Sequence, residues 1–164
     1  MIPLTPGQIR GSFVNLSRRQ AKELSVPPLE EVEWDCLDFF AWRHGRAADR
    51  SYLVAEHEGR LVSLALRTTE KKGLTPRSGM CGVCCTVQEG GNFGLFVATR
   101  AGASGRAGNS VGIYLCGDLD CSLYVRGIKP RVTRKQMGET LPRRDRVARL
   151  QLNLAEFIGK VLEE

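Results

Sequence analysis

Four of the six cysteines form two closely spaced pairs that could hold a metal ion. Cys81 and Cys84 make a C-x2-C motif, and Cys116 and Cys121 make a C-x4-C motif. Structural zinc sites use four tetrahedral ligands, with thiolate sulfur at about 2.3 Å from the ion. A C-x2-C turn presents two thiolates to one ion and points backbone N–H groups at their sulfurs. We therefore predict that Cys81, Cys84, Cys116 and Cys121 together bind one structural zinc ion.

A zinc ion with four cysteine ligands has no open position for water or substrate, whereas catalytic zinc keeps one exchangeable ligand. Its binding free energy is then expected to act as folding free energy. No other residues indicate an enzyme, because His44 and His57 lie in polar surroundings and no motif links either to a cysteine. A nucleophilic cysteine would need such a base nearby. We predict a non-catalytic protein without a small-molecule substrate.

The remaining cysteines are Cys36 and Cys85. Cys85 could replace Cys84 as a ligand, but the C-x2-C spacing is the commoner arrangement and favours Cys84. Cys36 lies in an apolar segment and is interpreted as a buried thiol. Disulfides are not expected, because they require an oxidising compartment and residues 1–5 lack the charged and apolar regions of a secretory signal.

The composition is that of one small basic domain. The chain has 164 residues, 42% of them hydrophobic, and a formal net charge of +6 from 24 Lys and Arg against 18 Asp and Glu. This charge favours an acidic partner, either a polyanion or an acidic protein. No run of about 18 apolar residues is present, so no transmembrane helix is predicted. We expect a cytoplasmic protein that does not bind membranes.

The first half of the sequence predicts a helix and a hairpin. A helix start with a capping box is indicated by Thr5, Pro6 and Gln8. The spacing of the apolar residues that follow predicts that this helix continues to about Leu24, before Pro27. The aromatic segment 34–42 is interpreted as a core anchor, with a partner site as the alternative. Residues 51–55 and 61–67 predict a β-hairpin with its turn at 58–59.

The second half predicts the frame of the zinc site. Strands are expected at 93–100 and 111–115, joined by the glycine-rich segment 101–110. Asp118 or Asp120 could cap a short helix that ends near Gly127, and a long apolar-striped helix begins near Pro142. Cysteine knuckle, hairpin and helix follow each other as in a treble-clef zinc finger. We predict an α+β fold: a small antiparallel sheet with N- and C-terminal helices around a four-cysteine treble clef. We expect residues 1–164 to form a single domain with a zinc-finger core at about 78–128.

Residues 80–84, 100–102, 105–116 and 121–124 carry a family resemblance, and residues 4–16 and 34–42 extend it. They resemble the elongation factor G-binding family, whose C-terminal domain is the FBP treble-clef zinc finger and which includes the fusidic-acid resistance proteins. The resemblance implies that the four cysteines bind zinc and that elongation factor G is the partner. Resistance members have a separate helical bundle before this domain, and only residues 1–33 precede the aromatic segment here. We therefore expect binding rather than resistance.

Candidate partner contacts lie near the second cysteine pair. Arg106 and Asn109 belong to the glycine-rich segment, and Arg100 directly precedes it. Glycines there allow a partner to approach the backbone closely, and arginines suit carboxylate or phosphate. The alternative is that this segment is a flexible hairpin tip whose charges only favour solubility. The family resemblance favours contact between this segment and a partner. Tyr114 and Tyr124 flank the cysteines and could bind a partner or pack around the zinc.

Arg126 begins a basic segment, 126–149, with nine Lys or Arg and two acidic residues. Such a segment could follow a phosphate backbone, although a solvated connector is favoured and no stacking aromatics accompany it. The leading interpretation is a zinc-dependent binding module that binds elongation factor G and modulates its release from the ribosome. The alternative is a zinc-finger protein that binds RNA or the ribosome, including ribosomal RNA, through the basic segment.

Overall fold

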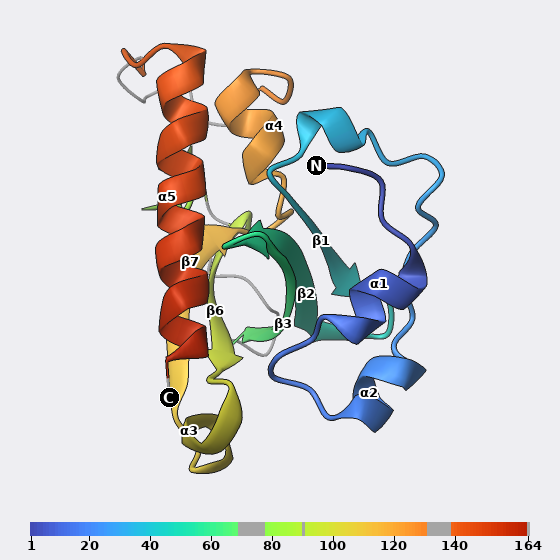
Figure 1. The fold of residues 1–164 in the computed structure, drawn as a ribbon. Helices are drawn as coiled ribbons and strands as arrows, with labels where there is room; N and C mark the ends of the chain where they lie inside the picture. Colours follow the sequence, from blue (N-terminus) through green and yellow to red (C-terminus); the bar gives the residue numbers. More distant parts are fainter. Residues whose placement is uncertain (69–77, 90, 131–138, 164) are drawn as a thin grey trace.

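A five-stranded antiparallel sheet forms the centre of the protein (Figure 1). This computed structural model describes residues 1–68, 78–89, 91–130 and 139–163. The strands are β1 (Phe39–His44), β2 (Ala47–His57), β3 (Arg60–Thr68), β6 (Phe93–Thr99) and β7 (Ser110–Cys116). Their order in the sheet is β1-β2-β3-β6-β7, so β1 and β7 are its edges. A separate two-stranded ribbon consists of β4 (Gly79–Met80) and β5 (Val87–Gln88). The predicted α+β class is confirmed.

The β2–β3 hairpin was predicted and is present. Leu53 pairs with Leu64, and the register continues without a shift to His57 opposite Arg60. The two turn residues, Glu58 and Gly59, both have positive φ angles, of 51° and 71°. A two-residue turn with this backbone matches the right-handed twist of the flanking strands, which fixes the register of the hairpin.

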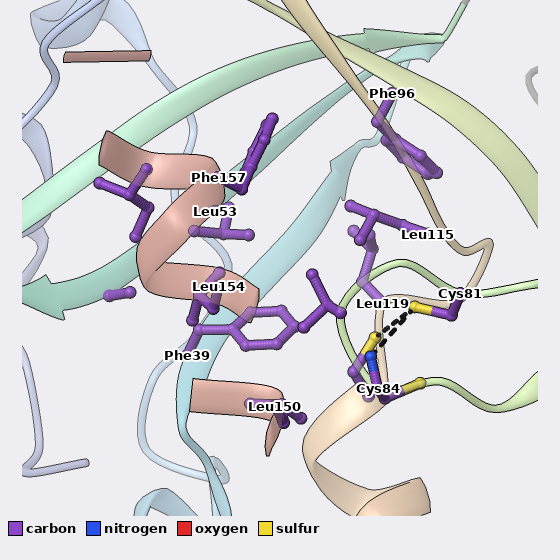
Figure 2. Packing of buried hydrophobic residues seen from close by; sticks show 14 of the residues in the cluster. Phe39, Leu53, Cys81, Cys84, Phe96, Leu115, Leu119, Leu150, Leu154 and Phe157 are labelled. Carbon is purple, nitrogen blue, oxygen red and sulfur yellow. Dashed lines mark hydrogen bonds between the residues drawn. The ribbon is translucent and has the colours of Figure 1, made fainter. Parts of the chain in front are cut away.

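The long C-terminal helix α5 (Arg143–Leu162) covers one face of the sheet (Figure 1). It begins directly after Pro142, as predicted, and its apolar stripe is buried. Figure 2 shows Leu150, Leu154 and Phe157 of this helix beside Leu53 from β2 and Phe39 from β1. The larger hydrophobic core therefore lies between α5 and the sheet, and it extends to the cysteines.

The opposite face of the sheet is covered in part by N-terminal segments. Here α1 (Pro6–Gly11), α2 (Arg18–Glu23) and the 3-10 helix η1 (Trp34–Cys36) enclose a second core. Its fully buried centre contains Ile9 and Val54, and Trp34 packs on Phe40 with ring centroids 5.3 Å apart. The interpretation of segment 34–42 as a core anchor is thus confirmed, and β1 forms its second half.

The predicted continuous N-terminal helix is wrong. The chain leaves helical geometry after Gly11, because the backbone of Ser12 and Val14 hydrogen-bonds to Ser63 of β3. A second capping box, Ser17 with Gln20, then starts α2, which ends before the prolines. Tertiary pairing with the sheet has overridden the helical periodicity.

Two short helices flank β7. The glycine-rich segment was expected as a loop, but Gly102–Arg106 forms α3 between β6 and β7. The predicted helix after the second cysteine pair is α4 (Cys121–Arg126), and Gly127 ends it in the left-handed conformation with φ 71°. Within the described parts of the chain, no helix has the length and apolarity needed to cross a membrane.

Candidate metal centre

The first cysteine pair lies on a knuckle between β4 and β5. The backbone N–H of Cys84 points at the Cys81 sulfur, with a nitrogen–sulfur distance of 3.4 Å. The N–H of Cys85 donates to the Cys81 carbonyl at 2.9 Å, and Cys85 adopts a positive φ of 56°. This turn holds both thiols on the same side of the chain.

The second pair forms a matching knuckle between β7 and α4. Cys116 is the last residue of β7, and Cys121 is the first residue of α4. The N–H of Leu119 donates to the Cys116 carbonyl at 3.1 Å, and Leu119 has a positive φ of 65°. The strand and the helix therefore fix the two ends of this turn.

The four sulfur atoms converge on one point. The Sγ atoms of Cys81 and Cys121 are 3.6 Å apart, those of Cys84 and Cys116 are 3.5 Å apart, and all four lie within 4.8 Å of one another. A tetrahedral ion at the usual zinc–sulfur distance separates its ligands by about 3.8 Å. All four cysteines are buried. The cluster is therefore positioned to bind a single structural zinc ion, as predicted.

Cys85 does not belong to this cluster. Its sulfur accepts a hydrogen bond from the Nδ2 atom of Asn153 on α5 at 3.6 Å, and burial raises the pKa of its thiol. The choice of Cys84 over Cys85 agrees with the geometry. Cys36, interpreted as a buried thiol, is half-buried at the end of η1.

The electrostatics of the thiols favour a cation. Hydrogen bonds from Cys116, Cys121 and Cys84 hold the pKa of Cys81 well below its usual range. Hydrogen bonding to Cys116 and to the other thiols, together with burial, raises the pKa of Cys121 well above its usual value. A single negative charge is thus stabilised, and further thiolates require a positive ion to offset their repulsion.

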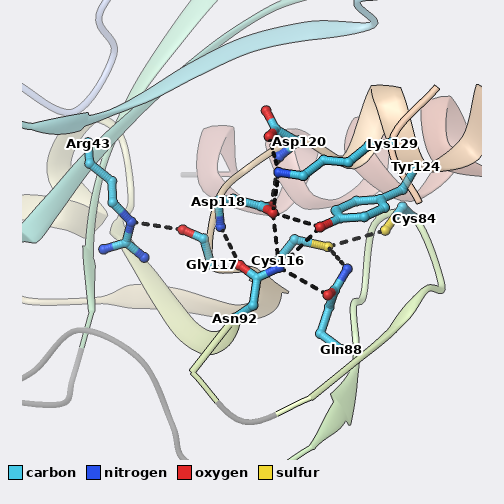
Figure 3. A network of polar contacts seen from close by, with 10 residues as sticks. All are labelled: Arg43, Cys84, Gln88, Asn92, Cys116, Gly117, Asp118, Asp120, Tyr124 and Lys129. Carbon is cyan, nitrogen blue, oxygen red and sulfur yellow. Dashed lines mark hydrogen bonds and ion pairs between the residues drawn. The ribbon is translucent and has the colours of Figure 1, made fainter. Parts of the chain in front are cut away.

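A polar network supports the second knuckle from outside the sulfur cluster (Figure 3). The Gln88 side chain donates to the Cys116 sulfur at 3.3 Å and accepts from Asn92 at 3.0 Å. The side-chain oxygen of Asn92 also accepts from the backbone N–H of Asp118 at 2.8 Å. The backbone carbonyl of Asn92 accepts from the backbone N–H of Gly117 at 2.9 Å. Hydrogen bonds of this kind orient metal ligands and tune their basicity.

Asp118 is the centre of this network. One of its carboxylate oxygens accepts from Tyr124 at 2.7 Å, Lys129 at 2.8 Å and Asn92 at 2.9 Å. Burial alone would raise the Asp118 pKa, but the hydrogen bonds from Lys129 and Tyr124 outweigh it, and the pKa is lowered. The Arg43 guanidinium donates to the Gly117 carbonyl at 2.8 Å, on the other side of the knuckle. Asp118 lies within the C-x4-C motif, whereas Arg43, Gln88 and Asn92 fall in no motif of the sequence.

Removing the Asn92 side chain should weaken zinc binding while the four ligands remain. In Asn92→Ala, the hydrogen bonds that hold Gln88 and the Asp118 backbone are lost. We expect zinc affinity to fall about 10–100-fold, the usual cost of losing such support, in competition with a chromogenic chelator. Asn109→Ala, an exposed position, is the matched control and should bind zinc as the wild type does. Equal affinities for all three proteins would remove Asn92 from the support of the site.

The predicted partner residues divide into two groups. Arg106 and Asn109 are exposed at the α3 end of β7, and Arg100 is paired with Glu163 at 3.2 Å. Tyr114 is 49% exposed and stacks on Phe93, with ring centroids 5.1 Å apart. In contrast, two of the predicted residues are engaged inside the domain: Tyr124 is 1% exposed, and Arg126 pairs with the buried Asp38.

Part of the basic segment 126–149 lies outside the described residues, namely 131–138. Several of its described cations have carboxylate partners within the domain: Arg126 with Asp38, Lys129 with Asp118 and Asp120, and Arg149 with Glu139. Much of the positive charge in the described part of segment 126–149 is therefore paired with carboxylates of the same domain.

Comparison with known proteins agrees with this geometry. The sequence matches the model of the FBP C-terminal treble-clef zinc-finger family over residues 8–161. No curated protein sequence matches the chain. Among solved structures, the fusidic acid resistance protein FusC resembles the chain with a TM-score of 0.52 and 18% sequence identity. The match covers 87% of this chain and 52% of FusC, so the chain spans about half the length of that protein. A likeness at this identity shows the fold alone.

Proposed function

The chain belongs to the FBP C-terminal treble-clef zinc-finger family, and on this premise we propose that it is a non-catalytic, zinc-dependent module that binds translation elongation factor G. The resemblance of the family motifs to elongation factor G-binding proteins supports this partner, and the FusC-like fold is consistent with it. Binding would shift the ribosome-bound population of the factor and so modulate its release, without covalent chemistry. Such a partner implies a cytoplasmic protein. The domain would act as one unit, with its zinc-finger core at about 78–128.

The composition of the metal centre supports a non-catalytic role. Four cysteine ligands complete the tetrahedral shell of a zinc ion and leave no exchangeable position. The sulfurs are also buried, and the polar residues around them are hydrogen-bonded to one another. The metal would therefore stabilise the fold that presents a contact surface.

The observation that carries the proposal is an exposed strip along α3 and β7. Arg106 is exposed and has no ion-pair partner among the residues described by the structure. On β7, Tyr114 offers a ring held in place by Phe93. Met80 of β4, which precedes the first cysteine, is 59% exposed. Arginine and rigid aromatic side chains are the types enriched at the energetic centres of interfaces.

The zinc knuckle is linked directly to this strip. The backbone N–H of Gly82, between the first two cysteines, donates to the Tyr114 carbonyl at 2.7 Å. A Cβ atom at position 82 would lie 3.1 Å from the Ile113 side chain and 3.3 Å from that carbonyl, so glycine permits the close approach. Loss of zinc would therefore disturb the strand that carries Tyr114. We place Arg100, Arg106, Asn109 and Tyr114 in the proposed contact, and we assign Tyr124 and Arg126 to the support of the fold.

Titration calorimetry of the zinc-loaded protein against purified elongation factor G tests the partner. We expect a one-to-one complex that persists when the salt concentration is raised. The absence of heat and of a complex would refute the proposal. Affinity for ribosomal RNA that falls steeply with salt would instead identify a nucleic-acid binder.

Arg106→Ala should weaken this complex without affecting the metal site. Truncating an arginine at the centre of an interface costs more than about 1 kcal/mol, so we expect at least about a fivefold loss of affinity. Arg60→Ala, at the exposed start of β3, is the matched control and should bind with unchanged affinity. Zinc content should be the same in both variants. Wild-type affinity in Arg106→Ala would exclude this strip as the contact.

A further inference from the structure

A second candidate site lies away from the metal centre and from the proposed contact strip. It is a cleft of about 390 Å³ between the N-terminal segments and the face of the sheet opposite α5. This volume is within the range of small-molecule pockets. Leu16 and Leu24 line it from the N-terminal segments, and Val97 lines it from β6. Apolar side chains therefore line the cleft from both the N-terminal segments and the sheet, among polar and charged ones.

Tyr52 of β2 contributes a polar group to the lining of this cleft. Its side chain is only 5% exposed, and its ring is held by Trp42 and Phe13 at centroid distances of 5.1 and 6.0 Å. Its hydroxyl forms no hydrogen bond within the parts of the chain that the structure describes, but this oxygen is not enclosed by protein atoms. A tyrosine hydroxyl can both donate and accept a hydrogen bond. The fixed ring therefore presents an accessible hydroxyl to a molecule that enters the cleft.

Two arginines lie close to this hydroxyl. Burial raises the Tyr52 pKa, the positive charges of Arg50 and Arg67, which also line the cleft, oppose this rise, and the negative charge of Asp49 adds to it. Arg50 has no ion-pair partner in the described residues. Arg67 is 3.9 Å from Asp49, and both of these side chains are largely exposed. Its guanidinium therefore keeps donors available for another acceptor.

The other charged or titratable groups of the cleft do not cancel this positive field. Glu23 lines the cleft but pairs with Arg19 at 3.0 Å. The Nδ1 atom of His44 accepts from the backbone of Arg46 at 3.1 Å, so the neutral ring carries its proton on Nε2 and can donate from there. Two arginines and a histidine donor thus line the cleft together with the Tyr52 hydroxyl.

We propose that this cleft binds a small organic carboxylate whose charged end is held by Arg50, Arg67 and the Tyr52 hydroxyl and whose apolar part lies against Leu16, Leu24 and Val97. A guanidinium binds a carboxylate through paired hydrogen bonds, which a monoanion of this shape can accept. The apolar wall selects an acid with a hydrophobic body over an inorganic anion. The same chemistry is found in a free aromatic or aliphatic acid and in the C-terminal residue of a peptide. This site is independent of elongation factor G binding.

The test is an NMR titration of the zinc-loaded, isotopically labelled protein with three probes. Hydrocinnamate represents a free acid, N-acetylphenylalanine represents a peptide C-terminus, and hydrocinnamide lacks the charge. We expect saturable shifts of the amide signals of Tyr52, Ala65 and Val97 with one or both acids, and no saturation with the amide. The tighter of the two acids identifies the source of the ligand. No saturable shift with either acid up to about 20 mM, well above the range expected for ligands of this size, would overturn the proposal.

Variants separate a specific site from general attraction to a basic protein. Arg50 is exposed, so Arg50→Gln should fold normally and bind the preferred acid about tenfold more weakly, because a charge-assisted contact is lost. Tyr52→Phe should cost about threefold to tenfold for the same reason. Arg60→Gln removes an equal charge outside the cleft and should have no effect. Wild-type affinity in Arg50→Gln, or equal losses in Arg50→Gln and Arg60→Gln, would contradict the assignment.

Discussion

Replacing Cys81 or Cys121 with serine is expected to abolish zinc binding and to unfold the domain. Either change removes one of four buried sulfurs and leaves a three-ligand site with an uncompensated hydroxyl in the core. Structural zinc in small fingers contributes about 10–16 kcal/mol of apparent binding free energy, and a whole domain is stable by only about 5–15 kcal/mol. Loss of the metal therefore removes an amount comparable with the total stability of the fold.

Zinc content by elemental analysis and thermal unfolding by circular dichroism would measure this effect. The wild type should contain one zinc per chain and should lose its cooperative transition when a strong chelator is added. Cys36→Ser and Cys85→Ser are the matched controls, since both cysteines lie outside the sulfur cluster, and both variants should keep one zinc. A Cys81→Ser protein with one zinc and a wild-type transition would refute the four-cysteine site.

Leu154→Ala on α5 is expected to destabilise the domain strongly while leaving the zinc ligands in place. Leu154 is 4% exposed in the core between α5 and the sheet. Removing a buried leucine side chain costs about 2–5 kcal/mol through lost burial and the cavity that remains. The loss should appear as a lower midpoint with an unchanged slope when the zinc-loaded protein is unfolded in urea.

Leu152 offers a control on the same helix. It is 71% exposed, so Leu152→Ala should change stability by less than about 0.5 kcal/mol. Both variants change the intrinsic helix propensity equally, and their difference isolates the contribution of burial. Equal losses in the two variants would mean that α5 is not fixed against the sheet through its apolar stripe.

The sequence predicted features that depend on local spacing. The two cysteine pairs could be identified as metal ligands from the spacing of their members alone. The apolar stripe of α5 could be identified because it repeats along the helix without interruption. The Glu58–Gly59 turn favours a tight hairpin because glycine accepts a positive φ without strain. In each case one short-range physical requirement determines the local structure.

Features created by tertiary contacts could not be predicted in this way. The start of β1 packs into both cores, with Phe39 in one and Phe40 in the other, so it lacks the alternation typical of a half-exposed strand. The break after α1 depends on pairing with Ser63, which is distant in the sequence. Asn92 and Gln88 acquire their role at the metal centre only when β7 and the first knuckle are brought together. Tyr52 likewise lines a cleft through the packing of separate segments.

The position of the first knuckle across the edge of the sheet has a consequence for the solubility of the protein. β7 is an edge strand, and the outward-facing backbone groups of an edge can recruit a strand from another molecule. The contact from Gly82 to the Tyr114 carbonyl occupies part of this edge, while the other edge, β1, is interrupted by a register shift between Arg43 and His44. Zinc would thus hold the first knuckle over the edge of β7, and the metal-free chain would lose this contact. We therefore expect metal depletion to expose a template for aggregation, so that the ion would protect the folded protein against self-association as well as unfolding.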